Sequence, residues 1–156
     1  MKVDAHLNKF HRLDAMLARL DPVADRELWI WTAMNAGVHL LNAALHHHAV
    51  TRETDSFHSQ VEGVYAVPDR ATGMFRDEAH EAGDVMHVGQ PPLPGPLSPG
   101  IERACTALRE IEDLREPYVR GSQPVPPGEE ARWRNAYERC VAELRAALEA
   151  GHPEGR

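Results

Sequence analysis

The sequence predicts an all-α fold, an antiparallel helical bundle of four long helices and one short helix in a single domain over residues 1–156. Three observations predict it. Apolar residues recur every three or four positions in several long segments, which is typical of helices with one buried face. Pro and Gly punctuate the ends of these segments. A stretch rich in Pro and Gly, residues 65–100, lacks this periodicity, and we expect it to be a long irregular excursion.

The first two helices are expected over residues 3–20 and 21–50. Val3, Phe10 and Leu17 belong to the apolar stripe of the first. Asp21-Pro22 is a start signal for the second, an N-cap followed by Pro at the first helical position. The second helix is apolar on most of its circumference between residues 28 and 45. We therefore expect it to be the central helix, with the first helix packed antiparallel against it.

The next segment is harder to assign. Phe57, Val61 and Val64 have the spacing of a short helix of about three turns. Within the excursion, the alternatives are a short helix over residues 76–82 and a small hairpin between residues 63–67 and 85–88. The Pro-rich residues 90–100 exclude both helix and central strand, and we interpret them as a semi-rigid connector.

Two further helices complete the predicted bundle. Ser98-Pro99 is a second cap-plus-Pro signal, and the helix that follows should end near Glu116 because Pro117 stops it. After a loop over residues 121–128, the last helix should run to about Gly151. The predicted buried positions of these two helices are Ile101, Ala104, Cys105, Leu108, Ile111 and Leu114, and then Trp133, Ala136, Tyr137, Cys140, Val141, Leu144 and Leu148.

Composition limits the classes of partner. The formal net charge of −7 disfavours general nucleic-acid binding. No segment is long and apolar enough for a membrane span, and no charged region followed by an apolar run marks a secretory signal. We expect a cytoplasmic protein in which Cys105 and Cys140 are reduced core residues. The excess of Arg over Lys, with frequent Ala, Gly and Pro, indicates a GC-rich bacterial genome.

Ten histidines are many for a chain of 156 residues. A zinc or iron site requires three or four imidazole or carboxylate groups that converge. The candidates for such a site, which would hold a divalent metal, are His39, His58, His80, Glu81 and His87. Their spacing matches no established ligand motif. The simpler interpretation is that residues 46–48 form a solvated helix C-terminus and that His39 is a buried histidine with a hydrogen-bond partner.

A polar stripe crosses the otherwise apolar central helix. Its members follow at spacings of three and four, which places them on one face; they are Thr32, Asn35, His39, Asn42 and His46. An exposed face would be expected to carry charged residues, so these neutral or titratable groups favour partial burial. The alternatives are a homodimer seam, a hydrogen-bond network inside the bundle and a ligand groove.

The run from Glu27 to Leu45, with the Thr/Arg-rich turn and His58 that follow, resembles the second helix and turn of small bacterial HEPN-type helical proteins. Residues 111–115 and the loop into the last helix are also similar, so the resemblance covers about half the chain. It implies a helical bundle, commonly a dimer, and a ribonuclease motif at the edge of a late helix, in which four to six residues separate an Arg from a His. Arg120 stands where that His would follow Arg115. The fitting pair, Arg52 and His58, lies in an earlier segment than the family uses.

From these observations we expect a homodimeric binding or interaction module, with the polar stripe as its site and a small molecule or protein as its partner. No cofactor is required for that function. Two enzymes are the alternatives: a metal-dependent enzyme that uses the histidine and carboxylate candidates, and an HEPN-like ribonuclease that uses Arg52 and His58.

Overall fold

The computed structural model describes residues 1–53, 57–58, 64–69, 71–79, 84 and 96–150. Four α-helices make up its main body: α1 (Val3–Leu17), α2 (Arg26–His47), α3 (Pro99–Glu112) and α4 (Glu129–Glu149). The prediction of a mostly helical fold is confirmed. The fifth predicted helix is not found, because strands occupy the described part of its segment.

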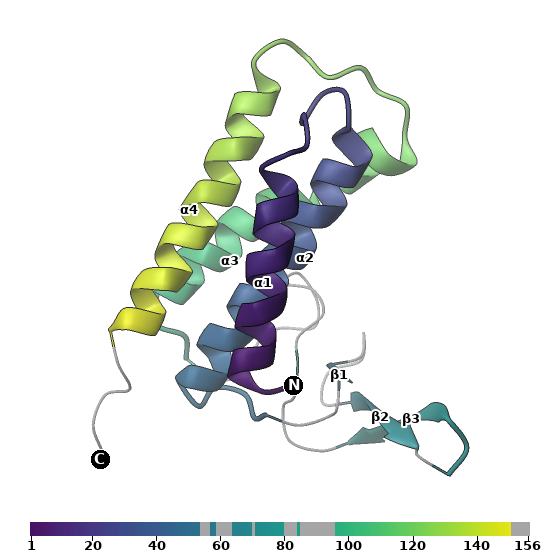
Figure 1. The fold of residues 1–156 in the computed structure, drawn as a ribbon, viewed down its shortest axis with the longest axis vertical. Helices are drawn as coiled ribbons and strands as arrows, with labels where there is room; N and C mark the ends of the chain where they lie inside the picture. The colour runs from purple at the N-terminus through teal and green to yellow at the C-terminus, as the bar shows by residue number, and fades with distance from the viewer. Residues whose placement is uncertain (54–56, 59–63, 70, 80–83, 85–95, 151–156) are drawn as a thin grey trace.

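The helices pack in two pairs, with α1 along α2 and α3 along α4 (Figure 1). Helix α2 also contacts α3 and α4, so it lies at the centre of the bundle as its apolar circumference predicts. Trp29 of α2 and Trp133 of α4 are both almost fully buried and lie 6.3 Å apart between ring centroids. Phe10 of α1 and Leu108 of α3 are fully buried in the same core.

Local signals explain where the helices begin. Asp21 accepts hydrogen bonds from the amides of Val23 and Ala24, both at 2.8 Å, so it caps a turn. Helix α2 itself begins at Arg26, later than the predicted start. The hydroxyl of Ser98 accepts from the amide of Ile101 and Pro99 opens α3, which confirms the second cap signal.

Helix α3 ends at Glu112, and a π-helical turn, η1 (Arg115–Arg120), follows it. The prediction that Pro117 ends helical structure was therefore wrong. Pro117 has no amide hydrogen to donate, and the amide of Gly121 reaches back five residues to the carbonyl of Glu116 at 2.9 Å. The wider turn also places the Arg115 guanidinium 4.8 Å from the Trp31 ring centroid.

Trp31 corrects one prediction about the core. Its side chain is 40% exposed, whereas Trp29 and Trp133 are buried as their spacing predicts. Trp31 lies on the outer side of α2, where Arg115 covers its ring through a cation–π contact. A second correction is smaller, since Val141 and Leu148 of the α4 stripe are partly buried instead of fully buried.

A three-stranded antiparallel sheet projects from one end of the helical bundle (Figure 1). Its strands are β1 (Phe57–His58), β2 (Val64–Asp69) and β3 (Met74–Ala79), in that order. These strands correct three expectations. They replace the short helix at Phe57 and the helix over residues 76–82, and they show that residues 65–100 are not irregular throughout. Val64, Tyr65 and Val67 favour a strand, and Gly73, with φ +70°, permits the tight turn between β2 and β3.

The predicted hairpin had the wrong second strand. Tyr65 of β2 pairs with Glu78 of β3, not with residues 85–88, which lie outside the described residues. No helix in the described part of the chain is long and apolar enough to cross a membrane.

Candidate metal centre

Three side chains from distant parts of the sequence meet at the end of the bundle where α1 begins and α2 ends. The Nε2 atom of His46 lies 2.8 Å from Oδ1 of Asp84, and the Nε2 atom of His6 lies 3.2 Å from the same oxygen. One donor atom from each residue lies within 4.8 Å of the other two. We call these three residues the His6–His46–Asp84 cluster.

The positions of His6 and His46 on their helices explain why both side chains face the cluster. His6 follows Val3 by three residues and precedes Phe10 by four, so it lies on the buried face of α1. His46 is in the last turn of α2, on the face directed at α1. Asp84 follows β3 in sequence. All three side chains are buried, with residue exposures of 1% for His6, 8% for His46 and 3% for Asp84.

A second layer of hydrogen bonds holds both imidazole rings. The Thr51 hydroxyl lies 2.8 Å from Nδ1 of His46, and Nδ1 of His39 lies 3.0 Å from Nδ1 of His6. Each ring therefore directs Nε2 towards Asp84 and has a partner at Nδ1. Ligand histidines in metalloproteins are oriented in this way, by an outer partner on the second ring nitrogen.

The cluster has one formal negative charge, at Asp84. Burial alone would raise the pKa of Asp84, but hydrogen bonds from His46, from His6 and from the ammonium group of Met1 outweigh that effect and lower the pKa below its usual value. The Met1 nitrogen lies 2.8 Å from each carboxylate oxygen. Asp84 is thus an ionised carboxylate at neutral pH, as a metal ligand has to be.

The donor set is that of a first-row divalent metal site. Two imidazole nitrogens and one carboxylate oxygen suit Zn²⁺ or Fe²⁺, whereas Ca²⁺ and Mg²⁺ favour oxygen ligands. Sites with three such protein ligands keep a position for water or substrate, while structural zinc sites are closed by four. Among the residues that the structure describes, three such ligands converge, and this described donor set favours a reactive centre over a structural zinc site.

The metal ligands that the sequence predicted are not members of the cluster or are not described by the structure. His39 lies next to the cluster, as the outer partner of His6, but is not a member of it. Glu81, His80 and His87 lie outside the described residues, and His58 is described only as backbone of β1. Those four candidates stay predictions.

The expectation that residues 46–48 form a solvated helix end was wrong. His46 is buried in the cluster, and Nε2 of His48 donates to the carbonyl of Ala147 at 2.9 Å. The C-terminus of α2 faces other elements here instead of water. Sequence reasoning also missed His6, although its place within the apolar stripe of the first helix was a usable signal.

The polar stripe of α2 changes character along its length. Thr32, Asn42 and His46 are buried, His39 is half-buried and Asn35 is exposed. The amide groups of Asn35 and Asn42 donate to carbonyls of their own helix, those of Trp31 and Val38. The stripe is therefore divided, with His46 in the cluster and the pair Asn35 and His39 in an open groove.

That groove lies between α1 and α2 and has a volume of about 430 Å³. Three of its residues are basic: Lys9 and Arg12 of α1, and Arg19 in the turn after α1. Burial is the main cause that lowers the pKa of His39 to about 4, and repulsion from His6, Lys9 and Arg12 adds to it. His39 is thus a neutral imidazole at pH 7 that lines the groove and contacts His6 of the cluster. We call this feature the α1–α2 groove.

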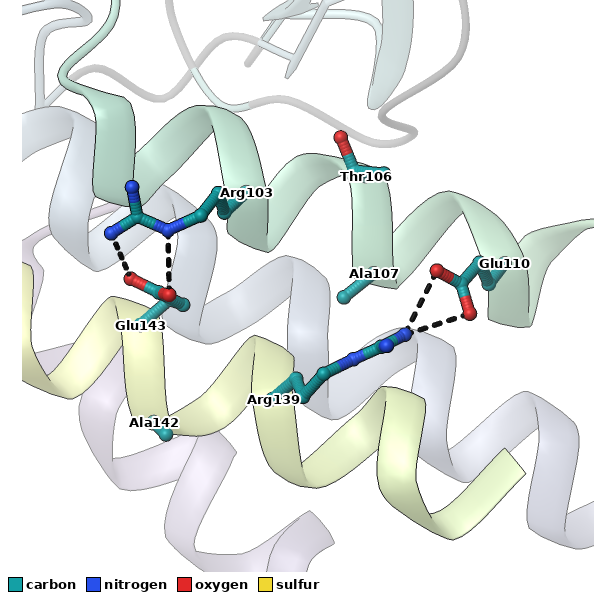
Figure 2. A pocket seen from close by; sticks show the side chains of 7 residues that line it. All are labelled: Arg103, Thr106, Ala107, Glu110, Arg139, Ala142 and Glu143. Atoms are coloured by element: carbon teal, nitrogen blue, oxygen red, sulfur yellow. Dashed lines mark hydrogen bonds and ion pairs between the residues drawn. The ribbon is translucent and has the colours of Figure 1, made fainter. Parts of the chain in front are cut away.

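A second groove, of about 350 Å³, lies between α3 and α4 (Figure 2). Its two cations are paired there, Arg103 with Glu143 at 2.7 Å and Arg139 with Glu110 at 2.8 Å. Small side chains, Ala107 and Ala142, line the space between these ion pairs. The charges of this groove satisfy one another, so it provides no free cation for a ligand.

The proposed ribonuclease pair is not on a helix. Arg52 is exposed in irregular chain, and His58 is in strand β1. No side-chain geometry is described for His58, so this alternative stays a prediction.

Comparison of the chain with models of protein families, with curated proteins and with solved structures gives no match.

Proposed function

We propose that this protein is a metal-dependent enzyme whose divalent ion, Zn²⁺ in the simplest case, is bound by His6, His46 and Asp84. A single observation carries the proposal. The Nε2 atoms of two buried histidines, from different helices, converge on one oxygen of a buried carboxylate.

The outer contacts support a ligand role for both rings. If Nε2 of His46 binds a metal, its Nδ1 carries the proton and donates to the Thr51 oxygen. In the same way, Nδ1 of His6 donates to Nδ1 of the neutral His39. One tautomer of each ring thus satisfies both outer contacts, at Thr51 and at His39, while it leaves both Nε2 lone pairs for the ion.

The reaction class follows from the donor set. His6, His46 and Asp84 would hold the ion, and Zn²⁺ with three protein ligands would supply a water molecule activated for nucleophilic attack at neutral pH. Hydrolysis is therefore the chemistry that such a centre supplies most directly.

The main rival is a purely structural network. In that case each Nε2 atom carries a proton, both rings donate to Asp84, and the Met1 ammonium group balances the carboxylate charge. The two hypotheses assign opposite tautomers to His6 and His46, and they differ in whether a metal binds tightly.

The deciding experiment is metal analysis of protein purified without a metal-affinity column, followed by titration of chelator-stripped protein with Zn²⁺ and Co²⁺. We expect one ion per chain and a Co²⁺ absorption spectrum typical of nitrogen and oxygen ligands. His6→Gln, His46→Gln and Asp84→Asn should each lower the affinity by about 10-fold to 100-fold or more.

His11→Gln is the matched control, because His11 is an exposed histidine on the same helix as His6. It should bind the metal as the wild type does. Circular dichroism checks that each variant retains its helices. Wild-type affinity that equals that of the three ligand variants would contradict the proposal and leave the structural network.

The expected binding or interaction module is the second candidate function. The observation that favours it is the α1–α2 groove, which contains two members of the polar stripe, Asn35 and His39. The homodimer and its seam stay predictions, as does the likeness to HEPN-type proteins.

A further inference from the structure

We propose that the α1–α2 groove binds a small organic anion, a molecule with a phosphate or carboxylate group attached to an apolar body. This ligand site goes beyond the metal centre, because none of the three ligand residues lines the groove.

Most of the basic lining comes from one face of α1. Lys9, Arg12 and Met16 follow one another at spacings of three and four, so their side chains share the face of α1 next to α2. Arg19 lines the groove from the turn that follows the last residue of α1, Leu17, so two cations lie towards one end of the groove and one towards the other. No acidic residue of the described part of the chain lines the groove.

These cations differ from the two in the α3–α4 groove. In the α3–α4 groove each Arg has a carboxylate partner within 2.8 Å (Figure 2). By contrast, Lys9, Arg12 and Arg19 form no ion pair with any residue that the structure describes. In a chain of net charge −7, three such cations in one groove form a local positive potential that attracts an anion.

One end of the groove is built for a polar head group. Lys9 and Arg12 both act electrostatically on His39, which places their charges near its ring. Nδ1 of His39 contacts His6, and Nε2 has no hydrogen-bond partner among the described residues. Two cations beside a free ring nitrogen form the kind of donor set that phosphate and carboxylate oxygens require.

The middle of the groove is apolar. Leu13 and Met16 line it and are both partly buried, while Asn35 lies opposite on α2. A volume of about 430 Å³ suits a small molecule, whose pockets typically measure about 300–1,000 Å³. The size and the three cations therefore favour a small molecule with an apolar body over a polymer such as RNA.

Calorimetric titration of the full chain with phenyl phosphate and with benzoate tests the proposal. Benzyl alcohol, which has the apolar body without the charge, is the ligand control. We expect saturable binding of an anion and none of the alcohol. Lys9→Gln and Arg12→Gln should each weaken the binding by about tenfold or more, the loss of one charge-assisted hydrogen bond.

Arg139→Gln is the matched protein control, since it removes the same charge from the other groove and should leave the affinity unchanged. The titrations are made with chelator-treated protein, so an anion that binds without metal separates this proposal from the metal centre. Absence of saturable binding, equal loss in Arg139→Gln, or binding of an RNA oligonucleotide but of neither small anion would overturn it.

Discussion

Nε2 of His46 lies 2.8 Å from Oδ1 of Asp84, and this contact joins the last turn of α2 to a residue 38 positions later in the chain. Both side chains are buried, so the contact replaces the water that each polar group had in the unfolded chain. His6 and the Met1 ammonium group share the same carboxylate. Asp84 is thereby joined to the start of α1 and to the end of α2.

Asp84→Asn should destabilise the metal-free protein by about 3 kcal/mol, because it removes the buried charge that three partners share. Urea unfolding in the presence of a chelator measures the change. Glu143→Gln, which affects an exposed ion pair with Arg103, is the control and should shift the midpoint far less. Equal shifts in the two variants would contradict a buried role for Asp84.

Gly37→Ala should destabilise the fold by about 1–2 kcal/mol, although Ala favours helix over Gly. A Cβ atom at Gly37 would lie 2.5 Å from Cδ1 of Leu108, a fully buried side chain of α3. Leu108→Ala alone should cost about 2–5 kcal/mol by leaving a cavity. The double variant should lose at least 1 kcal/mol less than the sum of the two, because the new methyl group occupies that cavity. Strict additivity in urea unfolding would show that α2 and α3 do not meet at Gly37.

Cys105 and Cys140 should resist thiol reagents in the native protein. Cys105 is 9% exposed and Cys140 is fully buried, and burial raises the pKa values of their thiols to about 11 and about 12. Labelling should therefore be slow in buffer and rapid for both thiols in denaturant, as a colorimetric thiol reagent would measure. Rapid labelling of folded protein would disprove the assigned packing of α3 against α4.

His39 should make the stability of metal-free protein decrease in mild acid. Its pKa is lowered from 6.5 to about 4 in the folded chain, mainly by burial, so the unfolded chain binds a proton more readily between these values. The stability that the neutral ring contributes is complete above pH 6.5, falls as the pH decreases, and is lost near pH 4.

His39→Asn keeps a polar group near the Nδ1 position without a titrating ring. The urea midpoint of this variant should decrease less steeply over the same pH range than that of the wild type. Other groups titrate in this window as well, so the difference between the two curves is the informative quantity. Parallel curves would show that folding does not lower the pKa of His39.

The sequence by itself determined the helical elements and much of their buried faces. Ile101, Leu108 and Ile111 recur at helical spacing and are fully buried, and Ser98-Pro99 begins the helix where a cap and a Pro predict it. These signals are local, because they depend on the three- and four-residue repeat of one helix and on amides within one turn. The same locality explains the error at η1, where a π turn accommodates Pro117.

Only the tertiary structure decided which polar groups meet. His6 and Asp84 are 78 residues apart, and their contact depends on the packing of α1 on α2 and on the position of Asp84 beside both helices. A repeat within one helix predicts which face is buried, but it carries no information about the residue that lies opposite. For that reason the sequence marked His39 and His46 as unusual, whereas their division between a groove and a buried cluster depends on the packing of helices against one another.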